Sequence, residues 1–354
     1  MQILSWQMTA PGAPLQLAER SFDVDSLGDE QALVEVAGCG VCHTDLGFYY
    51  DGVRTRRPLP LTLGHEIAGR VVRAGRRAGL AEGAAVVVPA VIPCGSCPDC
   101  RRGRGAVCKR QFFPGNDDHG GFASHVVVPA RGLAEVDDAA LSAAGLPLAT
   151  LAVIADAVTT PYQAIHNAQL EPGQVAVFIG VGGVGGFGVQ IARHLGARVV
   201  AIDVDPLRLV GAVGAELRVP AGDPREVKTQ LRSWAKSEGL SESGWRIFET
   251  SGHPKGQELA WSLLGYDSHL AVVGYTMEKI TIRLSNLMAF DATVRGTWGC
   301  LPEHYPAVVK LVLAGAVDIA GVTELRPMSE INTTFEDLHH HRLTRRPVLV
   351  PDFG

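Results

Sequence analysis

The segment VAVFIGVGGVGG, residues 175–186, joins an apolar run to a glycine-rich turn. Val175–Ile179 has the pattern of a buried strand, and Gly180, Gly182 and Gly185 follow it with G-x-G-x-x-G spacing at the start of a predicted helix, 185–195. Without side chains, the backbone can turn sharply there and approach a pyrophosphate at the helix N-terminus, where free amide groups favour anions. The segment predicts a dinucleotide-binding unit, with a ligand-free glycine turn as the alternative.

Strands and helices alternate downstream of this segment. A second strand, 199–203, ends at Asp203, eighteen residues after Gly185, where a carboxylate can bind the ribose hydroxyls. An acid at that position repels a 2′-phosphate, so NAD is preferred over NADP. Further apolar strands are expected at 247–250 and 270–273. The alternation predicts a doubly wound parallel sheet in an α/β protein.

The N-terminal region has a different texture. Short valine-rich segments bounded by turn residues predict strands at 32–37, 67–74, 85–89 and 123–129. Near the C-terminus, an apolar helix at 305–314 and a closing strand at 347–350 are expected to return to the first domain. We therefore predict one domain from residues 1–146 and 293–354, and a second from residues 147–292.

Composition narrows the class of protein. The 354 residues are 46% hydrophobic and 19% charged, which excludes disorder of the whole chain and suits two domains. A net charge of −5 gives no electrostatic reason to expect nucleic acid as a partner. No run of about eighteen apolar residues was found, and MQILSWQMTAPG lacks the pattern of a secretory signal, so we expect a cytoplasmic protein without a membrane span.

Four of the seven cysteines lie within one short loop, CGSCPDCRRGRGAVC. Cys94, Cys97, Cys100 and Cys108 have the spacing C-x2-C-x2-C-x7-C, which suits a closed tetrahedral zinc site with a structural role. Four buried free cysteines are the alternative. The spacings do not match those of common ferredoxin clusters.

A second set of metal-ligand residue types is dispersed along the chain. It comprises Cys42 in GVCHTD, His65 and Glu66 in LGHE, and Asp156 in ADAVTT. One thiolate, one imidazole and one carboxylate would leave a fourth zinc position open for water or substrate, as in a catalytic site. Taken singly, a Cys or His in a sequence is usually structural, so spacing alone does not prove this site.

In this order, GVCHTD, LGHE, the four-cysteine loop and GVGGVGG resemble the zinc-dependent medium-chain alcohol dehydrogenases over essentially the whole chain. The resemblance implies a GroES-like, mostly β catalytic domain and a Rossmann domain that binds NAD in the crevice between them. It also implies one catalytic and one structural zinc per chain, a small-molecule alcohol as substrate, and a homotetramer or dimer.

The resemblance implies specific roles near the catalytic zinc. Cys42 and His65 would be ligands, and Asp156 falls where many relatives have a second cysteine. Glu66 would be a near neighbour able to enter or leave the coordination shell, while Asp45 would orient the His65 imidazole.

Proton transfer and cofactor contacts are also implied. Thr44 would take the alcohol proton, and His43 would lie near the pyrophosphate; many relatives end the proton relay with a histidine where this chain has Gly47. The expected cofactor contacts are Gly180, Gly182, Gly183, Val184, Gly185, Asp203, the backbone of Val273, Gly274 and Tyr275, and Arg346, with Arg345 an equal candidate.

At finer grain, several segments resemble the dehydrogenases of 6-hydroxycyclohex-1-ene-1-carbonyl-CoA, which act in anaerobic benzoyl-CoA breakdown. The segments are GFYYDGVRT, VVVPA, PGND, GGFASHVVVPARGL, DAVTTPYQA and RLSNLMAF. They imply oxidation of an allylic alcohol in an alicyclic acyl-CoA. The arginines at 54, 56 and 57 and at 101, 102 and 104 would then meet CoA phosphates, or belong to solvated loops.

Two other interpretations stay open. One is a general secondary or allylic alcohol dehydrogenase of the same fold. The other is a non-catalytic nucleotide-binding protein or a zinc-free quinone reductase relative, against which Cys42, His65 and Thr44 argue. The triple histidine 339–341 is expected to be a solvated helix face rather than a metal site.

Overall fold

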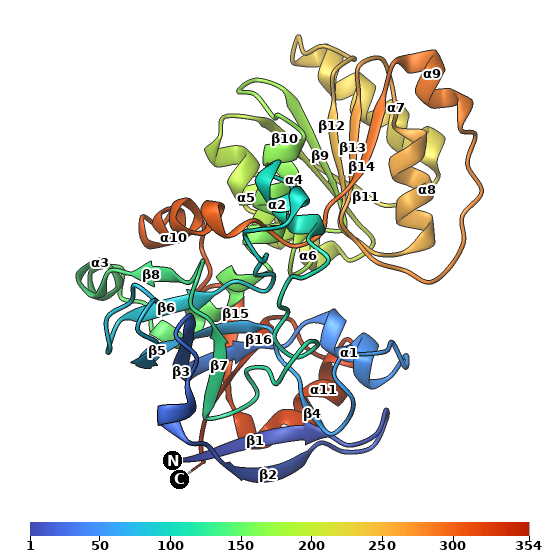
Figure 1. Ribbon diagram of the computed structural model, residues 1–354. Helices are drawn as coiled ribbons and strands as arrows, with labels where there is room; N and C mark the ends of the chain where they lie inside the picture. The colour runs from blue at the N-terminus through green and yellow to red at the C-terminus, as the bar shows by residue number, and fades with distance from the viewer. Residues whose placement is uncertain (354) are drawn as a thin grey trace. The chain divides into compact units, whose positions relative to one another are not determined.

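A six-stranded parallel sheet forms the centre of one of the two units of the computed structural model, which describes residues 1–353 (Figure 1). This unit 2, Thr160–Trp298, has the strand order β11-β10-β9-β12-β13-β14. Its strands are β9 (Val175–Ile179), β10 (Arg198–Asp203), β11 (Leu217–Pro220), β12 (Arg246–Glu249), β13 (His269–Val272) and β14 (Thr293–Gly296). The order reverses between β9 and β12, which is where doubly wound sheets bind their ligands. The predicted parallel sheet is confirmed.

Burial on both faces explains why β9 is apolar throughout. All five of its residues are buried. On one face the Phe178 ring stacks on Phe248 with centroids 4.6 Å apart, and on the other Val177 joins a core with Leu231 and Leu259 of two covering helices. The helices that extend into or lie within this unit are α4 (Thr159–Asn167), α5 (Gly185–His194), α6 (Pro206–Gly211), α7 (Pro224–Ser237), α8 (Pro254–Ser262) and α9 (Ser285–Phe290).

Unit 1 comprises Met1–Thr159 and the described residues from Gly299 onward. One sheet has the order β15-β16-β3-β5-β6-β8, with β7 paired to β3, and a smaller sheet has the order β2-β1-β4. The strands are β1 (Gln2–Met8), β2 (Gln16–Ser21), β3 (Gln31–Gly40), β4 (Leu61–Thr62), β5 (Glu66–Ala74), β6 (Ala85–Val88), β7 (His125–Pro129), β8 (Ala134–Val136), β15 (Thr323–Pro327) and β16 (Arg346–Val350). The mostly β character expected of this part of the chain is confirmed.

The register of the larger sheet places two predicted metal ligands close together. Strands β3 and β5 are antiparallel, with Gly40 opposite Glu66. The residues just after β3 therefore lie beside those just before β5, which brings together two predicted ligands that are 23 positions apart. The α-helices of this unit are α1 (His43–Tyr49), α2 (Pro98–Arg101), α3 (Asp138–Ala143), α10 (Tyr305–Leu313) and α11 (Ile331–His339), and its 3-10 helices are η1 (Val24–Ser26), η2 (Gly105–Val107), η3 (Leu148–Ala155), η4 (Pro302–His304) and η5 (Met328–Glu330).

The unit boundaries differ from the predicted ones in two places. Residues 147–159 belong to unit 1, because the apolar helix η3 is buried against β3, β5 and β6. Residues 293–298 belong to unit 2, because β14 is hydrogen-bonded to β13. The change from short valine-rich strands to alternating strands and helices indicated roughly where each boundary lies. Packing decides to which unit each boundary segment belongs.

One segment is longer and more apolar than expected. Leu148–Asn167 is long and apolar enough to cross a membrane, contrary to the expectation that no such run exists. However, 83% of its apolar window is buried inside the protein. Such burial is typical of a core segment of a folded domain.

Acid should weaken the loop that holds β4 in place. The His119 Nδ1 atom accepts a hydrogen bond from the Thr62 amide at 3.2 Å, and burial together with the charge of Arg57 lowers the pKa of His119 to about 4. Between about pH 6.5 and pH 4 the unfolded chain binds more protons at this residue, so stability falls as the pH falls. We expect His119→Asn to flatten the decline of Tm over this window, as measured by calorimetry. Parallel Tm curves for variant and wild type would contradict this.

Candidate active site and cofactor loop

Three predicted ligands converge in unit 1. Cys42 follows β3 as the N-cap of α1, His65 precedes β5, and Asp156 follows η3. The Asp156 Oδ2 atom lies 3.7 Å from Cys42 Sγ and 3.6 Å from His65 Nε2. With one carboxylate oxygen of Glu66, the donor atoms all lie within 4.8 Å of one another.

Asp45 organises this group from the first turn of α1. Its Oδ2 accepts from the Cys42 amide at 2.9 Å, its Oδ1 accepts from the Gly64 amide at 3.1 Å, and Oδ1 also lies 3.4 Å from His65 Nδ1. The imidazole is thereby turned with Nε2 toward Asp156. Burial lowers the pKa of His65, but Asp45 and Asp156 outweigh it and raise that pKa well above its ordinary value. The surroundings of this ring favour positive charge.

The Arg346 guanidinium lies on Glu66. Its Nε donates to Oε2 at 3.0 Å and its Nη2 donates to Oε1, and both side chains are almost fully buried. Burial raises the pKa of Glu66, while the Arg346 charge opposes that rise. Arg346 was expected to contact cofactor phosphates, but here it is bound to a buried carboxylate. Both oxygens of Glu66 accept hydrogen bonds from Arg346, and one of them lies within 4.8 Å of the donor atoms of Cys42, His65 and Asp156.

The donor set fits a zinc ion. A thiolate, an imidazole and a carboxylate are common zinc ligands, and ligand atoms about 3.3–3.8 Å apart suit tetrahedral bonds of 2.0–2.3 Å. Cys42, His65 and Asp156 would hold the zinc ion, which would supply a Lewis acid that polarises an alcohol oxygen and lowers the pKa of that alcohol. Thr44 Oγ1 lies 3.8 Å from Cys42 Sγ, beside this group, where a hydroxyl can take up a proton.

The predicted relay residues near Thr44 are placed as follows. His43 is the first residue of α1, and its ring lies 6.4 Å from the ring of His341. A Cβ atom on Gly47 would meet only ordinary contacts, the nearest being Val53 at 3.7 Å. The local fold therefore does not require glycine at position 47, and the missing histidine is a feature of this sequence rather than a steric necessity.

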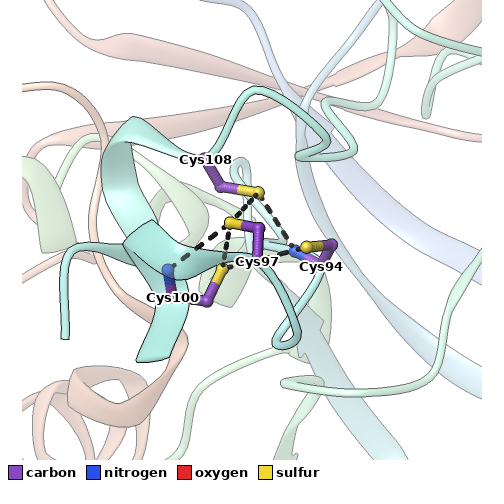
Figure 2. A group of neighbouring side chains, drawn as sticks. All are labelled: Cys94, Cys97, Cys100 and Cys108. Atoms are coloured by element: carbon purple, nitrogen blue, oxygen red, sulfur yellow. Dashed lines mark hydrogen bonds between the residues drawn. The ribbon is translucent and has the colours of Figure 1, made fainter. Parts of the chain in front are cut away.

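The four-cysteine loop forms a second group (Figure 2). Sγ of Cys97 lies 3.4 Å from that of Cys100 and 3.7 Å from that of Cys108, and Sγ of Cys94 lies 4.0 Å from that of Cys100. Tetrahedral zinc with bonds of 2.3 Å needs sulfur atoms about 3.8 Å apart. A backbone hydrogen bond at Ser96 lowers the pKa of Cys94 to about 5, whereas burial and the neighbouring thiols raise the pKa of Cys100 to about 12. These four residues fit a closed zinc site.

In unit 2, the glycine-rich turn has the form needed for a pyrophosphate. Gly180 has φ of +84°, and a Cβ there would lie 2.5 Å from Ser251 Cα; one on Gly185 would lie 1.9 Å from the Gly180 carbonyl oxygen. By contrast, a Cβ on Gly182 would meet only Arg208, at 3.6 Å. The protein itself therefore needs the outer two glycines, while the space over Gly182 suits a ligand. Helix α5 begins at Gly185, and its N-cap Val184 offers no side-chain hydrogen bond to the first amides, a helix N-terminus of the kind that favours anions.

Asp203 ends β10 next to this turn. It is buried, and its Oδ2 accepts from the Val181 amide at 2.7 Å while its Oδ1 accepts from the Asp205 amide at 2.9 Å. The carboxylate, which was expected to bind the cofactor ribose, thus also holds the glycine-rich turn through the Val181 amide. The segment predicted to contact nicotinamide follows β13, where the amides of Val273 and Gly274 donate to the Glu249 carbonyl oxygen. Tyr275 is exposed, and Gly183 and Val184 lie in the turn.

The arginine clusters and the histidine run are not assembled into sites. Arg56 pairs with Asp117 at 3.1 Å and Arg57 with Asp118 at 2.8 Å, so two arginines of the first cluster are already neutralised. Arg102 pairs with Asp99. Among residues 1–353, only the two groups described above gather metal-ligand atoms closely, and neither includes a residue of the 339–341 run.

Sequence reasoning missed two contacts of the active site. One is the pairing of Arg346 with Glu66, which joins residues 280 positions apart. The other is a hydrogen bond from Tyr305 to the residue before Asp156. No local pattern signals either of them, because both depend on where the C-terminal segment returns.

Comparison with known proteins agrees with this geometry. Residues 28–138 match the alcohol dehydrogenase GroES-like domain, and residues 183–314 match the zinc-binding dehydrogenase domain. An alcohol dehydrogenase of Rhizobium meliloti (strain 1021) is 30% identical over 342 residues, 96% of each chain. An L-threonine 3-dehydrogenase of Coxiella burnetii (strain Dugway 5J108-111) is 28% identical over 345 residues, 95% of each chain. The crystal structure of the alcohol dehydrogenase from Aeropyrum pernix superposes with a TM-score of 0.84 at 26% identity, covering 98% of this chain and all of that one.

The two domain matches and the full-length relatives agree with the two metal-ligand groups and the glycine turn. The protein is an oxidoreductase that acts on CH–OH groups with zinc and NAD(P). The chain belongs to the zinc-dependent medium-chain alcohol dehydrogenase family.

Proposed function

We propose that the protein oxidises 6-hydroxycyclohex-1-ene-1-carbonyl-CoA to the 6-oxo thioester with NAD, as a cytoplasmic step of anaerobic aromatic degradation. The hydroxyl-bearing carbon gives a hydride to NAD, and the hydroxyl gives up its proton by way of Thr44, so that a conjugated ketone, NADH and a proton are formed. Orientation of the two reactants would supply much of the acceleration.

One observation carries the finer part of this proposal. Two of the segments that resemble the acyl-CoA dehydrogenases, 47–55 and 114–117, lie next to each other in unit 1. The Arg56 amide donates to Asn116 Oδ1 at 3.0 Å, and the Arg57 amide donates to the Asn116 carbonyl oxygen at 2.8 Å. The residues that directly follow 47–55 are therefore hydrogen-bonded to the second segment, and the first segment begins in α1, the helix that carries Thr44. Arg54, in the first segment, is exposed and, among the described residues, takes part in no ion pair.

Preference for NAD rests on Asp203. Its carboxylate at the end of β10 disfavours a 2′-phosphate by charge repulsion. Assays with both cofactors test this directly, since a higher kcat/KM with NADP would contradict it.

The decisive experiment compares NAD reduction by 6-hydroxycyclohex-1-ene-1-carbonyl-CoA with NAD reduction by cyclohex-2-enol. We expect turnover of the thioester only. The Arg54→Ala variant should raise KM for the thioester and leave kcat unchanged, because a phosphate contact is lost far from the reacting carbon. Arg342→Ala, which removes another exposed arginine, one paired with Glu336 and Asp337, is the control.

A general secondary or allylic alcohol dehydrogenase is the second candidate. The curated relatives include dehydrogenases named for L-threonine and L-galactonate, so the scaffold accepts diverse alcohols. Equal turnover of cyclohex-2-enol and the thioester, with unchanged KM in Arg54→Ala, would favour this candidate.

We also propose that the protein forms a homo-oligomer through the edge of the unit 2 sheet. Strand β14 is a terminal strand of that sheet, and Val294, Met288 and Trp298 in its vicinity are exposed apolar side chains. An edge strand can pair with the same strand of a second copy about a two-fold axis. Sedimentation equilibrium should give at least a dimer; a monomer at micromolar concentration would contradict the proposal.

A further inference from the structure

Asp156 differs from the other two zinc ligands in how it is held. Cys42 and His65 flank strands β3 and β5, whose register is set by hydrogen bonds. Asp156 instead follows the 3-10 helix η3 and has backbone angles of −141° and −57°, outside helix and strand alike. Its position must therefore be fixed by contacts from other parts of the fold.

Tyr305 supplies such a contact. It is the first residue of α10, and among the described residues it has the largest side chain that is fully buried. Its hydroxyl donates to the Ala155 carbonyl oxygen at 2.5 Å, and the Ala90 amide donates at 3.3 Å both to the Tyr305 hydroxyl and to that carbonyl oxygen. Burial raises the pKa of the Tyr305 phenol well above its ordinary value, so the hydroxyl keeps its proton and remains a donor.

Peptide planarity connects this contact to Asp156. The Ala155 carbonyl oxygen shares one plane with the nitrogen and Cα of Asp156, so a donor that holds that oxygen also fixes where Asp156 begins. On the following peptide, Thr159 Oγ1 donates to the Asp156 carbonyl oxygen at 3.4 Å. The Tyr305 hydroxyl and the Ala90 amide therefore hold the peptide before Asp156, and the Thr159 hydroxyl holds the peptide after it.

We propose that Tyr305 is a positioning residue for the catalytic zinc: its hydroxyl holds the Ala155–Asp156 peptide so that the Asp156 carboxylate reaches the metal. This inference rests on Asp156 being a ligand of the catalytic zinc that the proposed function uses. The C-terminal segment would then help to form the active site, because the Tyr305 phenol is hydrogen-bonded to Ala155, 150 positions earlier in the sequence.

The test is metal release from Tyr305→Phe, in which the aromatic ring that fills the core is kept and only the hydroxyl is lost. Zinc per chain is measured after equilibration with a graded series of chelator concentrations. We expect one zinc to leave the variant at about 10- to 100-fold lower chelator concentration than it leaves the wild type, the range seen when an outer partner of a metal ligand is removed. The four-cysteine zinc should be released as in the wild type and serves as an internal reference.

A spectroscopic readout and a matched variant separate positioning from general loss of stability. In protein loaded with Co²⁺, the visible bands of the catalytic site should change in Tyr305→Phe, because the carboxylate ligand moves. Thr323→Val removes another buried hydroxyl of the C-terminal segment, one that donates to the Ile319 carbonyl oxygen at 2.8 Å. It should lower Tm by a similar amount without changing zinc release or the Co²⁺ spectrum.

Each outcome bears on a different claim. If the wild type holds two zinc ions and Tyr305→Phe releases both at wild-type chelator concentrations, Tyr305 does not position Asp156. Equal weakening in Thr323→Val would also overturn the inference. A wild type that holds a single zinc, in the four-cysteine loop, would overturn the metal assignment and with it this inference.

Discussion

His65→Ala should abolish alcohol oxidation while leaving the protein folded. The ring is buried, its Nε2 faces Asp156 and its Nδ1 faces Asp45, so no neighbouring side chain can take its place. Polarisation of the alcohol by zinc contributes several kcal/mol to transition-state stabilisation, and each 1.36 kcal/mol is a factor of ten. We expect kcat/KM to fall by about 10³-fold or more, as measured by NAD reduction with any alcohol that the wild type accepts.

Metal analysis distinguishes this cause from unfolding. The variant should retain one zinc per chain, and its affinity for NADH, measured by fluorescence titration, should be unchanged because the glycine turn belongs to unit 2. His194→Ala, at the exposed end of α5, is a control that should keep both zinc ions and full activity. Activity of His65→Ala within tenfold of the wild type would show that the catalytic metal does not depend on this residue.

Cys108→Ser should release the second zinc and open the loop 94–108. Cys108 is the buried member of the group, and its Sγ accepts from the Cys94 amide at 3.4 Å as well as lying beside Cys97. Structural zinc contributes directly to folding free energy, and the loop has no apolar core of its own to replace it. We expect an apparent Tm lower by about 10 °C, the shift that follows when a few kcal/mol are lost from a unit of this size.

Limited proteolysis reports on the loop itself. Arg101, Arg102 and Arg104 lie inside it and are exposed, so trypsin should cut Cys108→Ser there much faster than it cuts the wild type. Cys300→Ser alters a different buried cysteine and should keep both zinc ions and wild-type resistance to trypsin. Unchanged cleavage in Cys108→Ser would mean that the loop is held without metal.

Local signals were enough for the nucleotide-binding unit. The strand predicted at 175–179 coincides with β9, and the helix predicted at 185–195 differs from α5 by one residue. These elements are defined by neighbours in sequence: an apolar run that must be buried on both faces, and glycines that permit a tight turn. The four-cysteine loop was predictable for the same reason, because its ligands lie within 15 positions and can meet only one another.

Long-range pairing could not be anticipated in the same way. The family resemblance implied that Arg346 contacts the cofactor phosphates; in the structure it lies against Glu66, whose burial demands a counter-charge. Likewise, Arg56 and Arg57 looked like a free basic cluster until the loop at 116–118 brought Asp117 and Asp118 to them.

By itself, the sequence determined the chemistry available to this protein: thiolates, an imidazole and carboxylates for zinc, and a glycine turn for a dinucleotide. These depend on residue type and short spacing, which any conformation of the chain preserves. Only the tertiary structure decided which of these groups meet. Asp156 reaches Cys42 across 114 positions, and Tyr305 reaches Ala155 across 150, because a buried apolar helix and a returning C-terminal segment must pack on the same sheet. Burial of apolar surface is non-directional and involves the whole chain, so the resulting long-range contacts cannot be predicted from any short segment of sequence.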